Sequence, residues 1–258
     1  MSITERNSND LWIYDLARSR RTRFTFDPGA KPYAIWSRDG STIIWRNGPG
    51  ALYRKASNFT GTEQLVSADA GQSPSSLAPD DKTLLVVKGG TDIWALPLSE
   101  SSGKPLASRP VLISQSGEDH AQLSPDGKWM AYTSDESKTR EAYVMAYPGA
   151  GGKRQVSFGG ASHVRWRSDG RELFYLTRGG DLMAAEVTVV GDTLEVGPAQ
   201  RLFGGIANSE AAQGYVYDVA LEGTSTRFIV AEGIERRNAA PQSLTLVENW
   251  TGLLETVP

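Results

Sequence analysis

The sequence has 258 residues, of which 39% are hydrophobic and 22% charged, and a formal net charge of −3. This charge gives the chain no general attraction to nucleic acid or to an anionic membrane surface, so we expect neither as a partner. The absence of cysteine excludes disulfides, cysteine-based zinc sites and cysteine nucleophiles.

Two features of the chain bear on membranes and location. No apolar run approaches the roughly 18 residues that a membrane-spanning helix needs, so we expect no membrane insertion. Residues 1–10 are polar and lack the apolar centre of a secretory signal, which predicts a cytoplasmic location for the chain as it stands.

In chain order, two short strands are predicted first, at residues 11–16 and 23–26. A short phrase ending in an acidic residue and usually Gly then recurs along the sequence, with 41 to 53 residues between successive copies. Its copies are Trp36-Ser37-Arg38-Asp39-Gly40, Leu77-Ala78-Pro79-Asp80-Asp81, Leu123-Ser124-Pro125-Asp126-Gly127, Trp166-Arg167-Ser168-Asp169-Gly170 and a degenerate Val219-Ala220-Leu221-Glu222-Gly223. An internal repeat of this length is typical of repeat architectures, including propellers.

The surroundings of each copy predict four short antiparallel strands per repeat. An apolar-bearing segment precedes the phrase, and Asp-Gly between two strand-forming runs is a hairpin signal. Strands are expected after the phrase at residues 42–45, 83–87, 129–133, 172–176 and 227–231; then at 51–54, 92–96, 142–147, 181–187 and 244–250; and, as more polar strands, at 63–66, 111–113, 154–157 and 200–203. No segment keeps a helical period over three turns, so the fold class predicted is all-β.

The repeat resembles that of TolB-type β-propellers, which carry Trp-Ser-x-Asp-Gly followed by a strand ending in Tyr or Trp. Residues 123–132, which read LSPDGKWMAY, are the closest match, and the resemblance extends from Leu11 to Trp250. Residues 244–250 also resemble the end of propeller domains attached to some bacterial Ser/Thr kinases. The resemblance implies one β-propeller domain over residues 1–258. Because related propellers are often periplasmic, the cellular compartment of this protein stays open.

The strands at the two ends of the chain predict how the ring closes. An open sheet edge invites aggregation, so residues 11–16 and 23–26 are expected to share a composite blade with residues 244–250. That arrangement gives five blades, with a rearranged last blade or a sixth partial blade as the alternative. A monomer is expected, or a dimer that pairs spare strands.

Both histidines of the chain occupy the same repeat position. His120 and His163 each lie three residues before the start of a repeat phrase, so they are expected on neighbouring blades near the mouth of the central channel. Two imidazoles there could act as a general base or hold a divalent cation, assisted by Asp119 or Asp218. The alternative is that they are ordinary polar residues of the channel mouth. No other cofactor is predicted.

Nucleophilic catalysis has weaker support. No Gly-x-Ser-x-Gly motif is present, which excludes the α/β-hydrolase arrangement, and Ser162 beside His163 is the best-placed serine. Two functions follow from these residues. The first is a binding module that presents the channel face to a protein, a peptide or a small ligand, and the alternative is a hydrolase of an ester or lactone that uses the residues above.

Overall fold

The computed structural model describes residues 2–5, 8–98, 107–149, 151–206, 214–231 and 244–247. These residues form strands and turns without a helix, so an all-β fold is confirmed, and none of them forms a helix that could cross a membrane. The chain divides into two compact units, residues 1–110 and 111–258, and each is described separately below.

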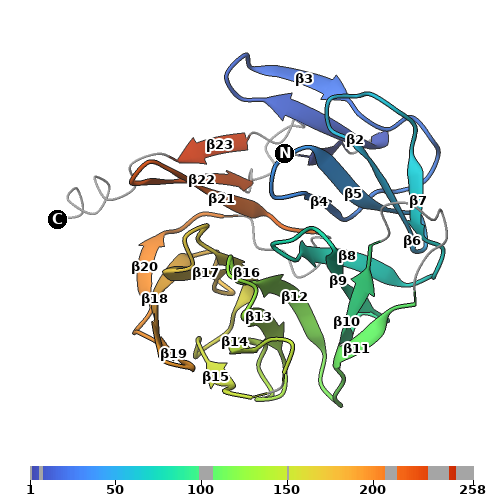
Figure 1. Ribbon diagram of the computed structural model, residues 1–258. Coiled ribbons are helices and arrows are strands. Elements are labelled where there is room, and N and C mark those ends of the chain that lie inside the picture. Colours follow the sequence, from blue (N-terminus) through green and yellow to red (C-terminus); the bar gives the residue numbers. More distant parts are fainter. Residues whose placement is uncertain are drawn as a thin grey trace. The chain divides into compact units, whose positions relative to one another are not determined.

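Residues 1–110 contain a three-stranded sheet and two four-stranded sheets, all antiparallel. Each four-stranded sheet has the strand order expected for a propeller blade (Figure 1). The strands are β1 (Ser2–Glu5), β2 (Ser8–Asp15) and β3 (Arg20–Arg23); β4 (Ala34–Trp36), β5 (Thr42–Asn47), β6 (Ala51–Ala56) and β7 (Gln64–Ser67); and β8 (Gln72–Leu77), β9 (Thr83–Lys88), β10 (Asp92–Pro97) and β11 (Arg109–Leu112).

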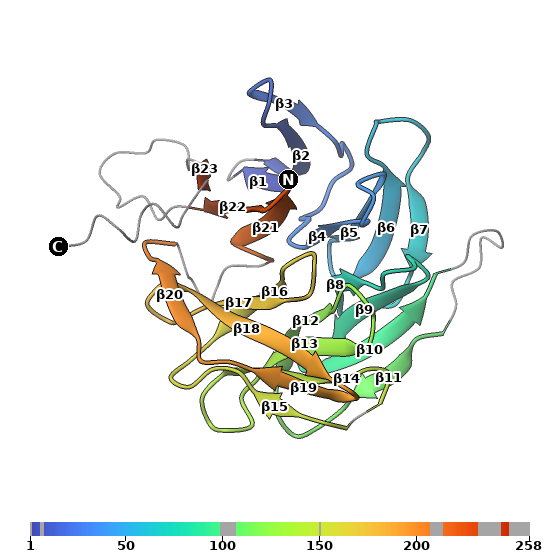
Figure 2. The same ribbon diagram turned by 60° about the vertical axis from the view of Figure 1, so that its left-hand side comes forward.

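Residues 111–258 repeat this organisation in three further sheets. The second of them is larger, because β18 is long enough to pair with both β19 and β20 (Figure 2). The strands are β12 (Glu118–Leu123), β13 (Trp129–Ser134), β14 (Glu141–Ala146) and β15 (Arg154–Gln155); β16 (Ser162–Trp166), β17 (Glu172–Leu176), β18 (Leu182–Val190), β19 (Thr193–Val196) and β20 (Gln200–Phe203); and β21 (Tyr217–Glu222), β22 (Ser225–Ala231) and β23 (Leu244–Val247).

Closure of the ring by a composite blade from the two chain ends stays a prediction, because the two ends belong to different units. β2 pairs with β1 and β3, and β23 pairs with β22. Residues 2–5, which were not expected to be a strand, pair with β2 and supply its second neighbour. The described strands therefore form six sheets, residues 248–250 lie outside the described part, and the number of blades stays a prediction.

The repeat phrase forms the turn that joins the first two strands of a sheet. Between β12 and β13, the Ser124 hydroxyl donates to Asp126 over 2.5 Å and accepts the Trp129 N–H over 3.0 Å. The Gly127 N–H closes the turn by donating to the Ser124 carbonyl over 2.9 Å. Gly127 has a φ of 71°, a left-handed conformation that glycine adopts without steric cost.

The apolar face behind these turns is the core of residues 111–258. The strand period of two brings Trp129, Val144, Trp166 and Tyr175 into one buried cluster between the sheets of β12–β15 and β16–β20. A second cluster, which contains Phe174, packs the sheet of β16–β20 against β21 and β22. The sheets are therefore held face to face by large side chains.

The left-handed position of the turn can be tested at Gly127. We expect Gly127→Val to lower the free energy of unfolding by more than about 1 kcal/mol, because a β-branched residue is strained at positive φ. Gly127→Asp is the matched variant, since Asp81 takes this repeat position with a φ of 55° and Asp tolerates it better. Urea unfolding of both variants measures the difference, and equal stability of the valine variant and the native protein would contradict this account of the turn.

Candidate functional site

Two β-bulges at equivalent positions hold the two histidines. In β12 the register passes from Asp119 opposite Thr133 to Gln122 opposite Ala131, so one extra residue lies in β12. In β16 the same shift occurs after Ser162, opposite the strand β17. His120 and His163 sit in these bulges with φ values of 52° and 55°. Positive φ is rare outside glycine, and both bulges and such strain concentrate at functional sites.

The bulges bring the two imidazoles into direct contact. Their ring centroids are 4.4 Å apart, with 46° between the planes. Tyr215, which precedes β21, closes the group, with its ring centroid 5.3 Å from that of His120 and 6.1 Å from that of His163. The two histidines thus lie together, as expected for equivalent repeat positions, with one ring from β12, one from β16 and a third from the segment that precedes β21.

Hydrogen bonds to a buried carboxylate hold the loop that precedes β16. Glu141, at the start of β14, is 3% exposed and accepts the N–H groups of Gly159 and Gly160 over 2.8 and 2.9 Å. Its other oxygen accepts the Ser157 hydroxyl over 2.5 Å. These bonds fix the backbone that leads directly into Ser162.

Hydrogen bonds assign the tautomer of His163. Its Nε2 lies 3.2 Å from the Gly214 carbonyl, which can only accept, so Nε2 carries the proton. In the neutral ring Nδ1 then holds a lone pair, and it accepts the Ser162 hydroxyl over 2.9 Å. Ser162 and His163 are therefore brought together as base and hydroxyl, although neighbours in a regular strand point to opposite faces.

His120 takes the opposite tautomer. The Thr133 hydroxyl donates to the Asp119 carbonyl over 3.2 Å, so it accepts the long 3.4 Å bond from Nδ1 of His120. Nε2 of His120 is left as an acceptor. The Asp119 carboxylate lies 3.7 Å from Nδ1, beyond hydrogen-bond distance, and instead accepts the N–H of His120 over 2.7 Å. Asp119 therefore shapes the bulge more directly than it orients the ring.

Both histidines are neutral near pH 7. Burial, together with the smaller effect of the positive charges of Arg140 and Arg165, lowers the pKa of His120 to about 3. Burial is also the main cause that lowers the pKa of His163 to about 3. Burial raises the pKa of the Asp119 carboxyl, because the charged form loses its water. No group of three or more His, Asp or Glu side chains within the described residues is arranged to hold a metal ion.

The arrangement includes an arginine that sequence reasoning missed. The Arg165 guanidinium lies 3.5 Å from the centroid of the Tyr215 ring. Asp218, expected beside the histidines, is paired with Arg165 instead, with its carboxylate 3.6 Å from Nε. The repeat could have indicated Arg165, because the residue directly before each repeat phrase occupies an equivalent position. That position holds Gln122, Arg165 and Asp218 in three of the copies.

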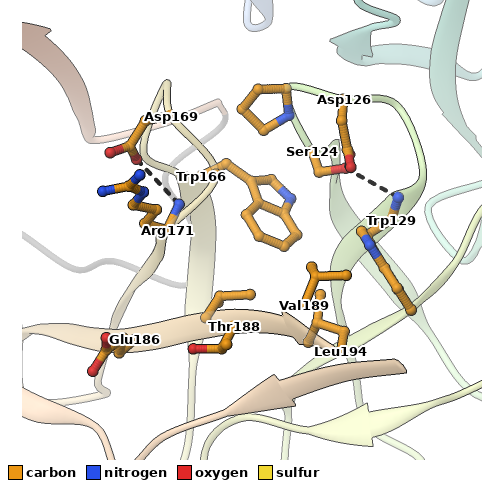
Figure 3. Close-up of a pocket in the computed structure, with 13 residues that line it drawn as sticks. Ser124, Asp126, Trp129, Trp166, Asp169, Arg171, Glu186, Thr188, Val189 and Leu194 are labelled. Atoms are coloured by element: carbon orange, nitrogen blue, oxygen red, sulfur yellow. Dashed lines mark hydrogen bonds between the residues drawn. The ribbon is translucent and has the colours of Figure 1, made fainter. Parts of the chain in front are cut away.

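A separate pocket of about 630 Å³ lies at the other end of the same strands. Figure 3 shows the Trp166 ring between the turns that carry Asp126 and Asp169, with Val189 and Leu194 of the β18–β19 hairpin opposite. Asp126 and Asp169 accept N–H groups of their own turns. The carboxylates of Asp126 and Asp169 therefore have structural roles in their turns. The histidines lie at the opposite ends of β12 and β16.

Solved structures identify the fold. The chain matches TolB from Acinetobacter baumannii with a TM-score of 0.62 and 16% identity, over 90% of this chain and 60% of that one. It matches the Swd1 β-propeller domain from Myceliophteria thermophila with a TM-score of 0.61 and 11% identity, over 96% and 86% of the two chains. The chain has the fold of a TolB-type β-propeller.

Other propeller folds among the matches belong to enzymes. A candidate 6-phosphogluconolactonase from Bacteroides fragilis matches with a TM-score of 0.59 and 15% identity, over 96% of this chain and 79% of that one. No protein-family model and no curated protein matches the sequence. Because all these identities are low, the TolB-type likeness establishes the fold, and the function of this propeller must be argued from its own residues.

The buried neutral histidines predict a pH-dependent stability. In the unfolded chain both rings gain a proton as pH falls below about 6.5, whereas the folded rings stay neutral until about pH 3. The unfolded state therefore binds more protons, and lowering the pH from 7 to 5 should destabilise the propeller by about 2 kcal/mol per histidine at most. The free energy of unfolding across this window measures the effect.

Since the sequence has only two histidines, the variant His120→Gln/His163→Gln serves as the control. Its stability should depend much less on pH between 5 and 7. Carbon NMR of the two imidazoles would report the protonation state directly, and a normal pKa near 6.5 for both rings would show that the site is more open to water than described.

Proposed function

We propose that this propeller is a binding module whose recognition face is formed by His120, His163 and Tyr215. The observation that carries the proposal is the pair of matched bulges, which place two neutral imidazoles in contact at a backbone cost. Strain of about 1–3 kcal/mol per residue persists only where the surroundings impose it, and such positions cluster at ligand sites. The ligand is a protein, a peptide or a small molecule.

The protonation states favour binding over acid–base chemistry. A general base works best when its pKa is near the operating pH, and a pKa of about 3 makes either imidazole a weak base. Neutral rings that keep one lone pair and one N–H are instead suited to fixed hydrogen bonds. Aromatic edges and faces beside them add apolar contact, as in other ligand sites.

A ligand screen tests the proposal. We would titrate a fixed panel of organic acids, amino acids, tripeptides, sugars and nucleosides against the protein by ligand-observed NMR. At least one class should bind, and His120→Ala/His163→Ala should weaken it about tenfold or more, because the acceptor Nε2 of His120 and the contact surface of both rings are lost. Thr188→Ala, in the wall of the separate pocket, is the control and should leave that affinity unchanged.

The screen can also contradict the proposal in two ways. If every ligand that binds is sensitive to Thr188→Ala and insensitive to the histidine substitutions, recognition belongs to the separate pocket. If no member of the panel binds, this face has no role in recognising those ligand classes and the proposal fails.

One contact favours hydrolysis of an ester or lactone as a second candidate. The Ser162 hydroxyl donates to Nδ1 of His163, while the Gly214 carbonyl holds the other ring nitrogen. In the reaction, Ser162 Oγ would attack the carbonyl carbon and its proton would pass to Nδ1. The proton would then go to the departing alkoxide, and water would hydrolyse the acyl-serine by the reverse transfers.

This candidate predicts strong effects of single substitutions. With p-nitrophenyl acetate and γ-butyrolactone as substrates, Ser162→Ala and His163→Ala should each lower the rate about 10²-fold or more. Ser168→Ala, which removes an exposed turn hydroxyl, is the control. Hydrolysis at the native rate by the Ser162 variant would remove this serine from the mechanism, and no hydrolysis by the native protein would leave binding as the function.

A further inference from the structure

Arg165 is an enclosed cation whose guanidinium donors find no hydrogen-bond acceptor among the described residues. Its side chain is 12% exposed. Nε is buried and makes no hydrogen bond within the part of the chain that the structure describes. A guanidinium carries five N–H donors and stays charged at all relevant pH values, so leaving them unpaired away from water costs free energy.

The nearest protein groups hold Arg165 in place without using its donors. The Tyr215 ring supports one face of the guanidinium at 3.5 Å from its centroid. The Asp218 carboxylate, 59% exposed, lies 3.6 Å from Nε, which provides charge compensation but no hydrogen bond. Nη1 and Nη2 are therefore the guanidinium nitrogens that solvent reaches, and they are presented on a side chain that is already ordered.

Two nearby residues show that this lack of acceptors is specific to Arg165. Arg167, in the following turn, makes bonds of 2.8 Å to Asp169 and 2.5 Å to Glu172. The hydroxyl of Tyr217, which is 2% exposed, is a second buried group without a partner, and it interacts electrostatically with Arg165. Unpaired donors thus gather around Arg165, whereas the neighbouring arginine has acceptors from the chain.

We propose that Arg165 binds a carboxylate of the ligand through Nη1 and Nη2, in a bidentate pair supported by Tyr215. This inference rests on the proposed binding function and names the chemical class of its ligand. The planar fork of a guanidinium matches the two oxygens of a carboxylate, and a charge-assisted pair of this kind is stronger than a neutral hydrogen bond.

The charge balance favours a singly charged anion. Arg165 and Arg140 are the positive groups that act on His120, while Asp119 and Asp218 are the carboxylates beside the same groups, and both histidines are neutral. The site therefore has no surplus of positive charge to hold a dianion. A monocarboxylate is expected to bind more tightly than phosphate.

The test follows the Arg165 side chain directly. In protein labelled with 15N-arginine, the Nε–Hε signal of Arg165 is identified by its loss in Arg165→Lys. Titration with sodium acetate should shift this signal in a saturable manner, more strongly than inorganic phosphate and unlike sodium chloride. Arg165→Lys should weaken acetate binding, measured through the Tyr215 ring signals, about tenfold or more, because the bidentate pair is lost. Arg167→Lys should leave it unchanged.

Two further probes separate the sources of the carboxylate. If the ligand is a peptide C-terminus, N-acetyl-Ala-Ala with a free carboxylate should bind more tightly than acetate, and its C-terminal amide should not bind. Equal affinity for acetate and the free peptide would identify a small carboxylate, which also supports the proposal.

Equal binding of the free peptide and its amide, tighter binding of phosphate than of acetate, or a response that chloride reproduces would each overturn the proposal. The outcome is distinguishable from failure of the binding function itself. Should the panel described above yield a ligand that depends on His120 and His163 and bears no anion, the recognition face stands and the role given to Arg165 falls.

Discussion

The site depends on one extra residue in each of two neighbouring strands. Regular pairing would leave His120 and His163 in the ordinary alternation of β12 and β16, whereas the bulges turn them to positive φ and into ring contact. Such a conformation is unfavourable by itself, so the pairing on either side of each bulge must impose it. The stability of the sheets is therefore used to hold two imidazoles where they exclude water from each other.

Neutral histidines change which group dominates the electrostatics of the face. Once burial has kept His120 and His163 uncharged, the permanent cation that contacts Tyr215 is Arg165. The carboxylate of Asp218, which lies beside it, is mostly exposed and too distant for a hydrogen bond. The histidines thus contribute fixed directions for hydrogen bonds, and the arginine contributes charge, which is a division of roles suited to a polar ligand with one anionic group.

The features that recur in every repeat could be predicted from the sequence. The Asp-Gly turns, most strand positions and the convergence of the histidines follow from the period, because equivalent positions meet a similar environment in each sheet. The TolB-type fold was implied by the resemblance of the repeat to that family. Local irregularities were not predictable. No residue pattern marks either bulge. The strand β1 was missed because its residues are mostly polar, and the end of β18 was missed because its valines are exposed. Arg165 was missed because what distinguishes it is the lack of a hydrogen-bond acceptor among the described residues, and the sequence alone does not reveal such a lack.

The two ends of the first strand in each repeat differ in how much their residue types vary among the copies. At the turn end, Ser124 and Asp126 satisfy the backbone, and similar residues recur in most copies, since the hairpin needs them. At the bulge end, the position of His120 and His163 is taken by tyrosine, proline or valine in the other copies. Hairpin chemistry does not constrain that end, so its side chains are available for recognition. A ligand that spanned these repeats would meet histidine on β12 and β16 but different residues in the other copies, and this asymmetry would give a repetitive scaffold a specific site.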